Sequence, residues 1–348
     1  MKEIKKEIMY ILTIIGTSCG VIGGWFICAT KGFQANDMFL FWSGVITVVG
    51  MVLGLIGWGV KLIITAQKYF SVLKLTKNSK QLVANLSGTD NEKPEKMKDF
   101  VQKINHQFYD FVLRYDTTND NIIRKIIHTT TVADMCFSIA CKLKLNETDR
   151  SLAYLGGMLH DIGRFEQWKR YGTYNDQLSV DHGDLSYELC DQFDLSMLSV
   201  TDRETIKLAV KYHTKPYTGT DERIKLFNQI IMNADAYANI LNTANGAQRM
   251  TVTADGYTPA ILDDFINLKR VRDYSPKTKV DRALLLTACL YYVRYDFLRN
   301  QILAYNFFDV VSHSFLRYLN PTDQKVYLDA VATMRARYLD PAYSHHLV

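Results

Sequence analysis

The chain has 348 residues, of which 22% are charged and 48% are hydrophobic, and its formal net charge is +5. This composition excludes a collagen-like chain, a disordered tail and a disulfide-rich miniprotein, and the charge is too small to indicate nucleic-acid binding by itself. The averages suit an ordinary globular protein, but the charged residues are unevenly distributed. Between Ile8 and Val60 only Lys31 and Asp37 are charged. The chain therefore combines two segments of different character.

Two uncharged segments, residues 9–29 and 38–60, are each long enough to cross a bilayer as a helix. The first lacks a small-residue cleavage site followed by a polar region, which argues against a signal peptide. Neither segment contains Asp, Glu, Arg or His, as the interior of a pore or transporter usually does. We therefore predict a two-helix transmembrane hairpin within residues 1–60 that anchors the chain in membrane lipid.

The distribution of lysine predicts the orientation of this hairpin. The loop between the two segments has only Lys31, whereas the N-terminal tail has three lysines and residues 61–80 have five with no acidic residue. Because positive residues concentrate on the cytoplasmic side, we expect both termini to be cytoplasmic and the chain to lie in the inner or plasma membrane. Residues 61–95 are predicted to form a basic juxtamembrane helix and a linker.

The remaining residues, 96–348, are predicted to form a cytoplasmic all-α domain. Residues Thr201 to Glu204 match a capping box that would begin a helix, and Gly163 is expected to end the helix that carries His160. Only residues 245–258 have strand or turn character. Apolar residues recur at helical spacing almost throughout, for example at Leu152, Leu155, Leu159 and Ile162.

Six potential metal ligands lie within the apolar helical segments. The adjacent His160 and Asp161 would be about 100° apart on a helix and could both face one broad cavity. Imidazole suits Fe, Mn or Zn, and a carboxylate can bridge two cations. A carboxylate on an apolar helix face is costly unless it is paired or metal-bound. The candidates are His128 late in its helix, His160, Asp161, His182, His213 at a helix end, and Asp235 in mid-helix.

A buried histidine is by itself more often a hydrogen-bonded core residue than a ligand, but four with two aspartates favour a metal site. The order H…HD…H…H…D, with HDIG at residues 160–163, resembles the HD-domain metal-dependent phosphohydrolases. The resemblance covers residues 120–241, which it implies are a helical HD bundle, followed by a helical extension to residue 348. It implies two divalent cations as cofactors, and Mn, Fe or Mg fits better than Zn.

The resemblance also implies a role for each candidate residue. His128, His160, Asp161 and Asp235 would hold one metal, and His182 and His213 would hold a second that Asp161 bridges to the first. A metal-activated water would be the nucleophile, and no serine or cysteine context indicates a different one. The predicted catalytic residues are Asp161, Arg164 and Lys215. The side chains of Arg164 and Lys215 are expected to contact the phosphate. Further candidates for the substrate mouth are Gln167, Tyr171, Tyr174, Asp176 and Asp181.

Three departures from known branches of this superfamily leave the substrate open. The sequence after His213 reads HTKPYTGT and lacks the GYP signature of the cyclic-di-GMP branch. Ile162, Gly163 and Arg164 follow His160-Asp161, where the stringent-response hydrolases have an acidic pair after HD. Residues 61–120 are too few for the RNA-binding module of membrane-anchored HD ribonucleases, and they lack its GxxG loop.

The expected function is hydrolysis of a small phosphoester, a nucleotide or cyclic nucleotide, by a membrane-anchored phosphohydrolase or phosphodiesterase. The main alternative is a catalytically silent HD module that binds a nucleotide or partner and signals at the membrane. A nuclease is not expected, because no basic aromatic groove surrounds the candidate site. The helices after Lys279 are predicted to extend the packing of the domain, with a homodimer interface as the alternative.

Overall fold

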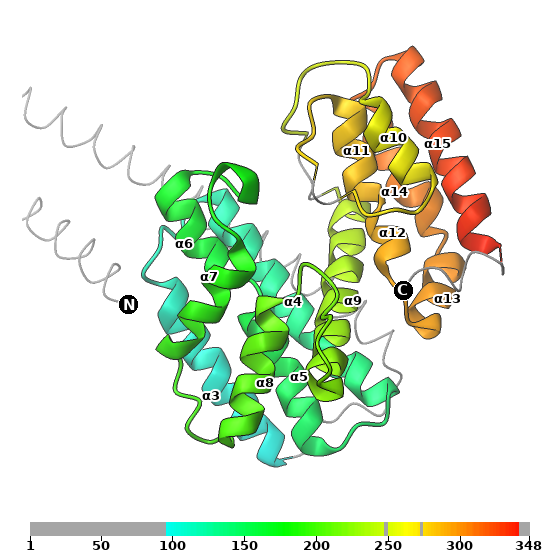
Figure 1. Cartoon of the computed structure of the whole chain (residues 1–348). Helices are drawn as coiled ribbons and strands as arrows, with labels where there is room; N and C mark the ends of the chain where they lie inside the picture. The colour runs from blue at the N-terminus through cyan, green and yellow to red at the C-terminus, as the bar shows by residue number, and fades with distance from the viewer. Residues whose placement is uncertain (1–94, 247–249, 272–273, 341–348) are drawn as a thin grey trace, which may run out of the picture. The chain divides into compact units, whose positions relative to one another are not determined.

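The computed structural model describes residues 95–246, 250–271 and 274–340 (Figure 1). Within these ranges the chain forms helices and no strand, which confirms the all-α prediction. The first group of elements is α3 (Glu95–Val112), α4 (Asp120–Lys142), α5 (Glu147–Leu159), α6 (Ile162–Tyr171), η1 (Asp176–Leu178), α7 (His182–Leu189), η2 (Cys190–Gln192), α8 (Val200–Lys211) and α9 (Glu222–Ala244). The second group is α10 (Pro259–Ile266), α11 (Lys279–Thr287), α12 (Cys289–Tyr292), α13 (Asp296–Ala304), α14 (Phe307–Leu316) and α15 (Pro321–Leu339).

The predicted transmembrane hairpin and basic juxtamembrane segment fall in residues 1–94, outside the described residues. No helix in the described ranges is both long enough and apolar enough to cross a membrane.

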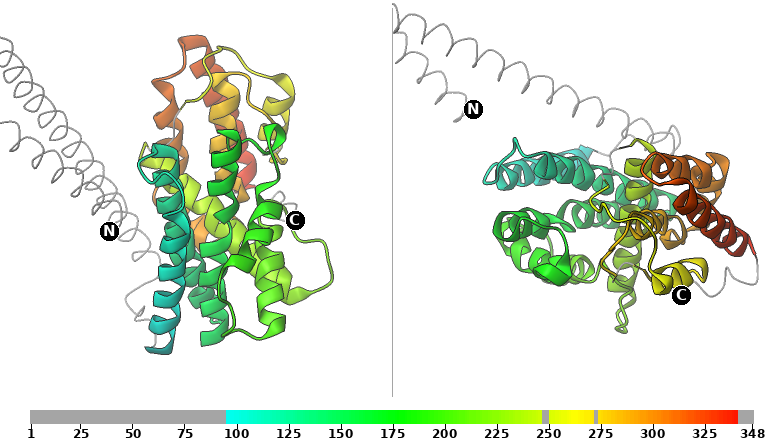
Figure 2. Two further views of the ribbon diagram at one scale, coloured as in Figure 1. Left: turned by 90° about the vertical axis from the view of Figure 1, so that its left-hand side faces the viewer. Right: turned by 90° about the horizontal axis from the view of Figure 1, so that it is seen from above.

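Helices α4 and α5 form the centre of the first group. Helix α4 packs against α5 and α9, α5 also packs against α3, α8 and α9, and α7 packs against α6 and α8 (Figures 1 and 2). The buried apolar side chains of these helices form one continuous core, which includes Phe108, Leu155, Phe165 and Phe227. The stabilisation of this bundle comes from that shared apolar face, since isolated helices of these lengths are marginal in water.

Polar side chains determine where several of these helices begin. Asn146 caps α5 by accepting from Asp149 N, and Asp221 caps α9 by accepting from the backbone of its first turn. The predicted capping box at Thr201 is wrong, because Ser199 is the cap of α8 and its hydroxyl accepts from the backbone N–H of Asp202. The start of α8 thus lies two residues earlier than the pattern indicated.

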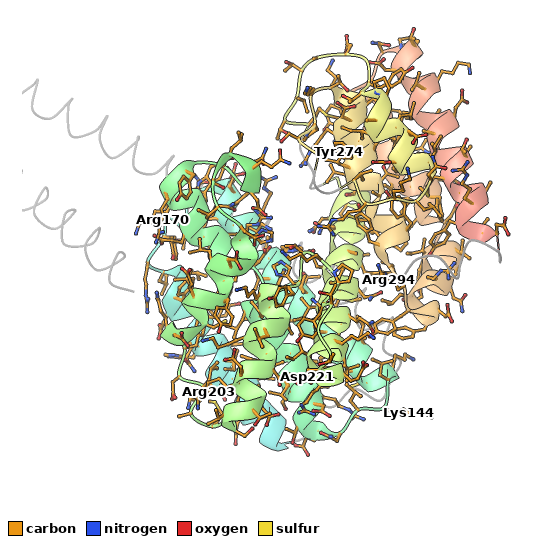
Figure 3. All side chains as sticks on the ribbon, in the orientation of Figure 1. Lys144, Arg170, Arg203, Asp221, Tyr274 and Arg294 are labelled. Atoms are coloured by element: carbon orange, nitrogen blue, oxygen red, sulfur yellow. The ribbon has the colours of Figure 1, made fainter. Side chains whose placement is uncertain are left out.

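The second group of helices packs on α9, which contacts α11, α12 and α14 as well as helices of the first group. A buried amide joins the two groups, because Asn233 Oδ1 accepts from the backbone N–H of Arg294 (2.6 Å) and of Tyr295 (3.2 Å). Within the second group the Tyr274 hydroxyl donates to Asp264 Oδ2 (2.6 Å); Figure 3 labels Tyr274 and Arg294. These contacts support the predicted helical extension after the bundle.

The chain between α9 and α10 is irregular where it is described. Residues 245–246 form a turn, and residues 250–258 run as loop up to Pro259. The turn character predicted for residues 245–258 is therefore present, without a strand in the described part of the segment.

Two adjacent glycines of α5 face different neighbours. A Cβ added at Gly157 would lie 2.6 Å from the Cα of Ala133 on α4, whereas at Gly156 it would lie 2.9 Å from the terminal Cδ1 of Ile231. The backbone of α4 cannot yield as a flexible side-chain end can. Gly157 thus permits the close contact between α4, which carries His128, and α5, whose C-cap residue is His160.

We expect Gly157→Ala to lower the free energy of unfolding by about 1–3 kcal/mol, because overpacking against the α4 backbone exceeds the gain in helix propensity. The matched control Gly156→Ala should be within about 1 kcal/mol of the wild type. Urea denaturation of the purified full chain measures both. Equal stability of the two variants would contradict the close contact.

Candidate metal centre

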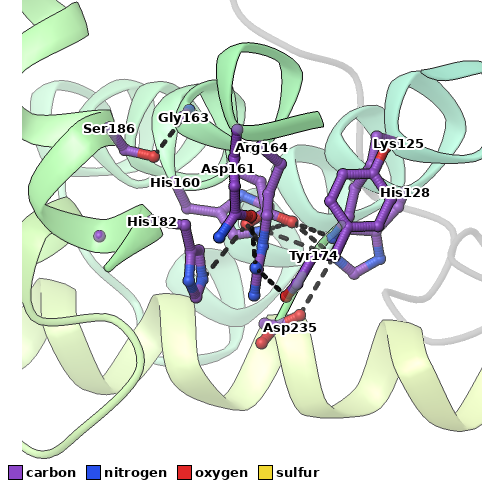
Figure 4. Close-up of polar contacts among 12 residues, drawn as sticks. Lys125, His128, His160, Asp161, Gly163, Arg164, Tyr174, His182, Ser186 and Asp235 are labelled. Carbon is purple, nitrogen blue, oxygen red and sulfur yellow. Dashed lines mark hydrogen bonds and ion pairs between the residues drawn. The ribbon is translucent and has the colours of Figure 1, made fainter. Parts of the chain in front are cut away.

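The six potential ligands come from separate parts of the chain and meet at one place; Figure 4 labels five of them, His128, His160, Asp161, His182 and Asp235. His128 lies in the middle of α4 and not late in it, and His213 lies two residues after the end of α8. His160 and Asp161 form the junction of α5 and α6, so they are not on one helix. The others are His182, the first residue of α7, and Asp235 in α9. Their exposed fractions range from 0% for His160 to 7% for Asp235.

The two oxygens of the Asp161 carboxylate face two different histidine pairs. Oδ2 lies 3.6 Å from His128 Nε2 and 3.5 Å from His160 Nε2. Oδ1 lies 3.6 Å from His182 Nε2 and 3.8 Å from His213 Nε2. Such an arrangement has the geometry of a carboxylate between two cation sites.

Asp235 completes one of the two donor groups that surround Asp161, because its Oδ1 lies 3.1 Å from His128 Nε2. Each group offers three ligand atoms within 4.8 Å of one another. The first group is His128, His160 and Asp235, and the second is Asp161, His182 and His213.

At three of the four imidazoles Nδ1 faces a hydrogen-bond acceptor, whereas His128 Nδ1 lies 3.4 Å from the side-chain nitrogen of Asn242, which can only donate. The Nδ1 atoms of His160 and His213 lie 2.7 Å from the carbonyl oxygens of Gly157 and Val210, and a carbonyl can only accept. The proton is therefore assigned to Nδ1, and Nε2 keeps its lone pair. His182 Nδ1 lies 2.6 Å from Asp176 Oδ2, which selects the same tautomer. Ligating histidines are commonly oriented in this way.

The Nε2 atoms of the four histidines lie in two close pairs, which fits the donor set to bound cations. His128 Nε2 lies 3.4 Å from His160 Nε2, and His182 Nε2 lies 3.1 Å from His213 Nε2. With both protons of the second pair on Nδ1, no hydrogen bond joins the two nitrogens. A divalent cation would satisfy both nitrogens and the nearby carboxylate oxygens, and mixed imidazole and carboxylate donors suit Mn or Fe.

The charges around the Asp161 carboxylate keep it ionised. Burial by itself would raise the pKa of Asp161, but Lys125, His160 and Arg164 outweigh it and hold this pKa well below its usual range. The nearest cation is Lys125, whose Nζ lies 2.5 Å from Asp161 Oδ2. An anionic carboxylate is the form that binds metal.

Arg164, a predicted phosphate contact, is held by neighbouring acceptors. Its Nη1 donates to Gln167 Oε1 (2.7 Å), the Tyr174 carbonyl oxygen (2.6 Å) and Asp176 Oδ1 (2.8 Å). The other oxygen of Asp176 bonds His182, so one carboxylate connects the arginine to a potential ligand. The pKa of Asp176 is lowered: burial opposes the change, but His182 and Arg164 outweigh it.

A cavity of about 520 Å³ opens onto this centre. Of the residues predicted for its mouth, Tyr174, Asp176 and Asp181 line it, together with Arg164 and the exposed Lys215. Gln167 and Tyr171 do not belong to the lining. Gln167 is fully buried and donates to Asp176 Oδ1, Ser179 Oγ and the Val180 carbonyl, whereas Tyr171 is exposed on the outer side of α6.

Gly163 does not end the helix that carries His160, as the sequence pattern predicted, but lies at the start of α6. Its N–H donates to Ser186 Oγ (2.9 Å), and an added Cβ would lie 2.6 Å from the His182 carbonyl oxygen. The absence of a side chain allows α6 and α7 to approach closely. The approach brings His182 opposite Asp161.

Sequence reasoning missed several cavity residues that lie on the same helix faces as the potential ligands. Lys125 precedes His128 by three residues, and Asn239 and Asn242 follow Asp235 by four and seven. Helical periodicity could have identified these residues, because such spacings share a face. Arg282 also lines the cavity, but nothing in the sequence connects α11 with the ligands.

Comparison with known protein families finds the HD domain over residues 126–240. This segment includes His128, His160, Asp161 and Asp235. The match supports the resemblance of this segment to the HD superfamily of metal-dependent phosphohydrolases. No curated protein and no solved structure gives a significant match to the chain.

We expect the metal-free protein to lose stability as the pH falls from about 6.5 towards 4. Burial lowers the pKa of His160 from 6.5 to about 4, so the unfolded chain binds more protons in this window. The free energy of unfolding must therefore rise with pH there, by about 1–3 kcal/mol for one such histidine.

Thermal denaturation between pH 4 and 7.5, with metal removed by chelation, measures this dependence. His160→Gln should give a shallower slope than the wild type, and the control His313→Gln, on the exposed side of α14, should keep the wild-type slope. Identical slopes for His160→Gln and the wild type would show that this histidine does not titrate abnormally.

Proposed function

We propose that the protein is a metal-dependent phosphohydrolase or phosphodiesterase that acts on a nucleotide or cyclic-nucleotide phosphoester. The observation that carries the proposal is the division of one carboxylate, Asp161, between two pairs of oriented histidines. The family match over residues 126–240 supports the same reaction class.

Each part of the centre has a defined task in this proposal. His128, His160 and Asp235 would hold one cation, His182 and His213 would hold the other, and Asp161 would contribute to both. When bound, two divalent cations lower the pKa of a water molecule and stabilise the phosphoryl oxygens during in-line displacement. The backbone acceptors at Gly157 and Val210 and the carboxylate of Asp176 keep Nε2 of three histidines directed at the centre.

The cations around the cavity bind and orient the phosphoester. The Arg164 guanidinium is fixed by Asp176, and its Nε lies 3.6 Å from Asp161 Oδ1, so it sits beside the reacting phosphate. Lys215 is exposed at the rim of the cavity and meets the substrate as it enters. The volume of about 520 Å³ is sufficient for a nucleotide-sized molecule.

Asp161→Asn should strongly lower hydrolysis, because a neutral amide would be a much weaker ligand for a divalent cation than a carboxylate. We expect the full chain purified with Mn²⁺ to hydrolyse at least one member of a panel of mono-, cyclic and dinucleotides. Asp161→Asn and His160→Ala should each lower that activity by at least about 1,000-fold, which corresponds to roughly 4 kcal/mol of transition-state stabilisation. The matched control is His313→Ala, whose ring is exposed on α14.

Metal analysis distinguishes this proposal from a silent binding module. If the centre is catalytic, we expect two equivalents of metal per chain in the wild type and fewer in Asp161→Asn. Unchanged hydrolysis in Asp161→Asn would overturn the proposed mechanism. Less than one equivalent of metal together with no hydrolysis across the panel would favour the silent module.

We propose in addition that residues 9–29 and 38–60 anchor the chain in the inner or plasma membrane, with the helical domain in the cytoplasm. The support is the pattern of the sequence: two charges in this whole stretch, and lysines concentrated before it and after it. The catalytic domain would then act on a soluble substrate close to the membrane surface.

The full chain should remain in the membrane pellet after an alkaline carbonate wash and enter the supernatant only with detergent. Carbonate strips proteins that are held by charge alone, so the lysines of residues 61–80 cannot account for retention. A variant without residues 9–60 is the control and should be soluble. Release of the full chain by carbonate would contradict the hairpin.

A further inference from the structure

The cavity extends beyond the HD segment to the helices that follow it. Arg282, Leu285 and Leu286 of α11 line it, and so does Cys289 at the start of α12. Their spacing of three, four and seven residues places them on one helix face. One wall of the cavity is therefore supplied by the helical extension, outside residues 126–240.

The guanidinium of Arg282 is held in this wall without an acidic partner. Its Nε is buried and has no hydrogen-bond partner, and no carboxylate of the described residues forms an ion pair with it. Burial lowers its pKa, and Arg124, a second cavity cation, lowers this pKa further. A buried guanidinium nitrogen without a partner is costly, and an anion bound at Arg282 would offset that cost.

The adjacent carboxylate, Asp281, does not neutralise Arg282. It is fully buried and accepts hydrogen bonds from Thr258 N (2.7 Å), Thr258 Oγ1 (2.8 Å), Thr278 N (3.1 Å) and Lys277 N (3.1 Å). Asp281 also completes the capping box that begins α11. These bonds fix the start of the helix and thus the direction in which Arg282 points.

Charge is unevenly distributed around the cavity. The carboxylates in its lining all belong to the metal centre or to its neighbours on the α6–α7 side: Asp161, Asp176, Asp181 and Asp235. The charged side chains that line another part of the cavity are all cationic. They come from the start of α4, from the loop that follows α10, and from α11, and they are Arg124, Lys125, Arg270 and Arg282. Lys125 forms an ion pair with Asp161 at the metal centre. The other cationic side chains of this part of the lining are the arginines.

We propose that Arg282, beside Arg124 and Arg270, forms an anion subsite for a second phosphate of the substrate. The inference rests on the proposed function and deepens it: the substrate class becomes a nucleotide with a second phosphate besides the one at the metal centre. The guanidinium fork suits the planar, bidentate recognition of phosphate oxygens. Leu285 and Leu286 offer apolar surface for the nucleoside between the two anionic groups.

The test is calorimetric titration of metal-free full-chain protein with adenosine 3′,5′-bisphosphate and, separately, with adenosine. We expect the wild type to bind the bisphosphate at least tenfold more tightly than adenosine. Arg282→Gln should lose at least tenfold in affinity for the bisphosphate while its affinity for adenosine changes less than twofold. Arg282→Lys, which keeps the charge but not the fork, should have an intermediate affinity.

The matched control is Arg317→Gln, an exposed arginine at the end of α14, which should bind the bisphosphate as the wild type does. Circular dichroism checks that each variant is folded; if Arg282→Gln is not, Arg282→Lys decides. The subsite would be overturned if Arg282→Gln bound the bisphosphate as tightly as the wild type, or if it lost affinity for adenosine to the same extent. It would also be overturned if the wild type showed no preference for the bisphosphate over adenosine. The assay needs no hydrolysis and no metal, so its failure and that of the phosphohydrolase proposal are separate results.

Discussion

One buried carboxylate sets the geometry on which the helical domain depends. Asp161 is 3% exposed, and its oxygens lie between 3.5 and 3.8 Å from the Nε2 atoms of four histidines. A charge at this depth is costly unless it is compensated, so the surrounding helices must bring cations or metal ligands to it. Lys125 and Arg164 supply part of that compensation. The same demand makes the site suitable for binding divalent cations.

Bringing side chains from so many elements to one carboxylate requires unusually close backbone contacts. Gly157 permits the approach of α5 to α4, and Gly163 permits the approach of α6 to α7. Hydrogen bonds behind the site then hold the imidazoles at fixed angles, since three of them use Nδ1 on a carbonyl or carboxylate. The centre is therefore preorganised by packing and by its outer hydrogen bonds, which limits the reorganisation needed when a ligand binds.

The helical extension has a place in this arrangement beyond packing. It is fastened to α9 through Asn233, and α11 turns Arg282 towards the same cavity that the metal centre opens into. The cavity thus has carboxylates and imidazoles together with Arg164 on one side, and on the other side cationic side chains without a carboxylate in the lining. A substrate with two separated anionic groups matches both sides, because bound cations would attract one group and the guanidinium groups the other.

The sequence by itself determined the all-α class and predicted six potential ligands whose order resembles the HD domain matched over residues 126–240, because helical periodicity and the order of histidine and aspartate are local features. It misplaced local boundaries, as at Ser199 and Gly163, since hydroxyl and glycine patterns fit more than one cap. Only the tertiary structure decided that Asp161 divides its oxygens between two histidine pairs, and that Arg282 shares their cavity. Both depend on how distant segments pack, and that packing follows from the shape of a common core which no single segment encodes.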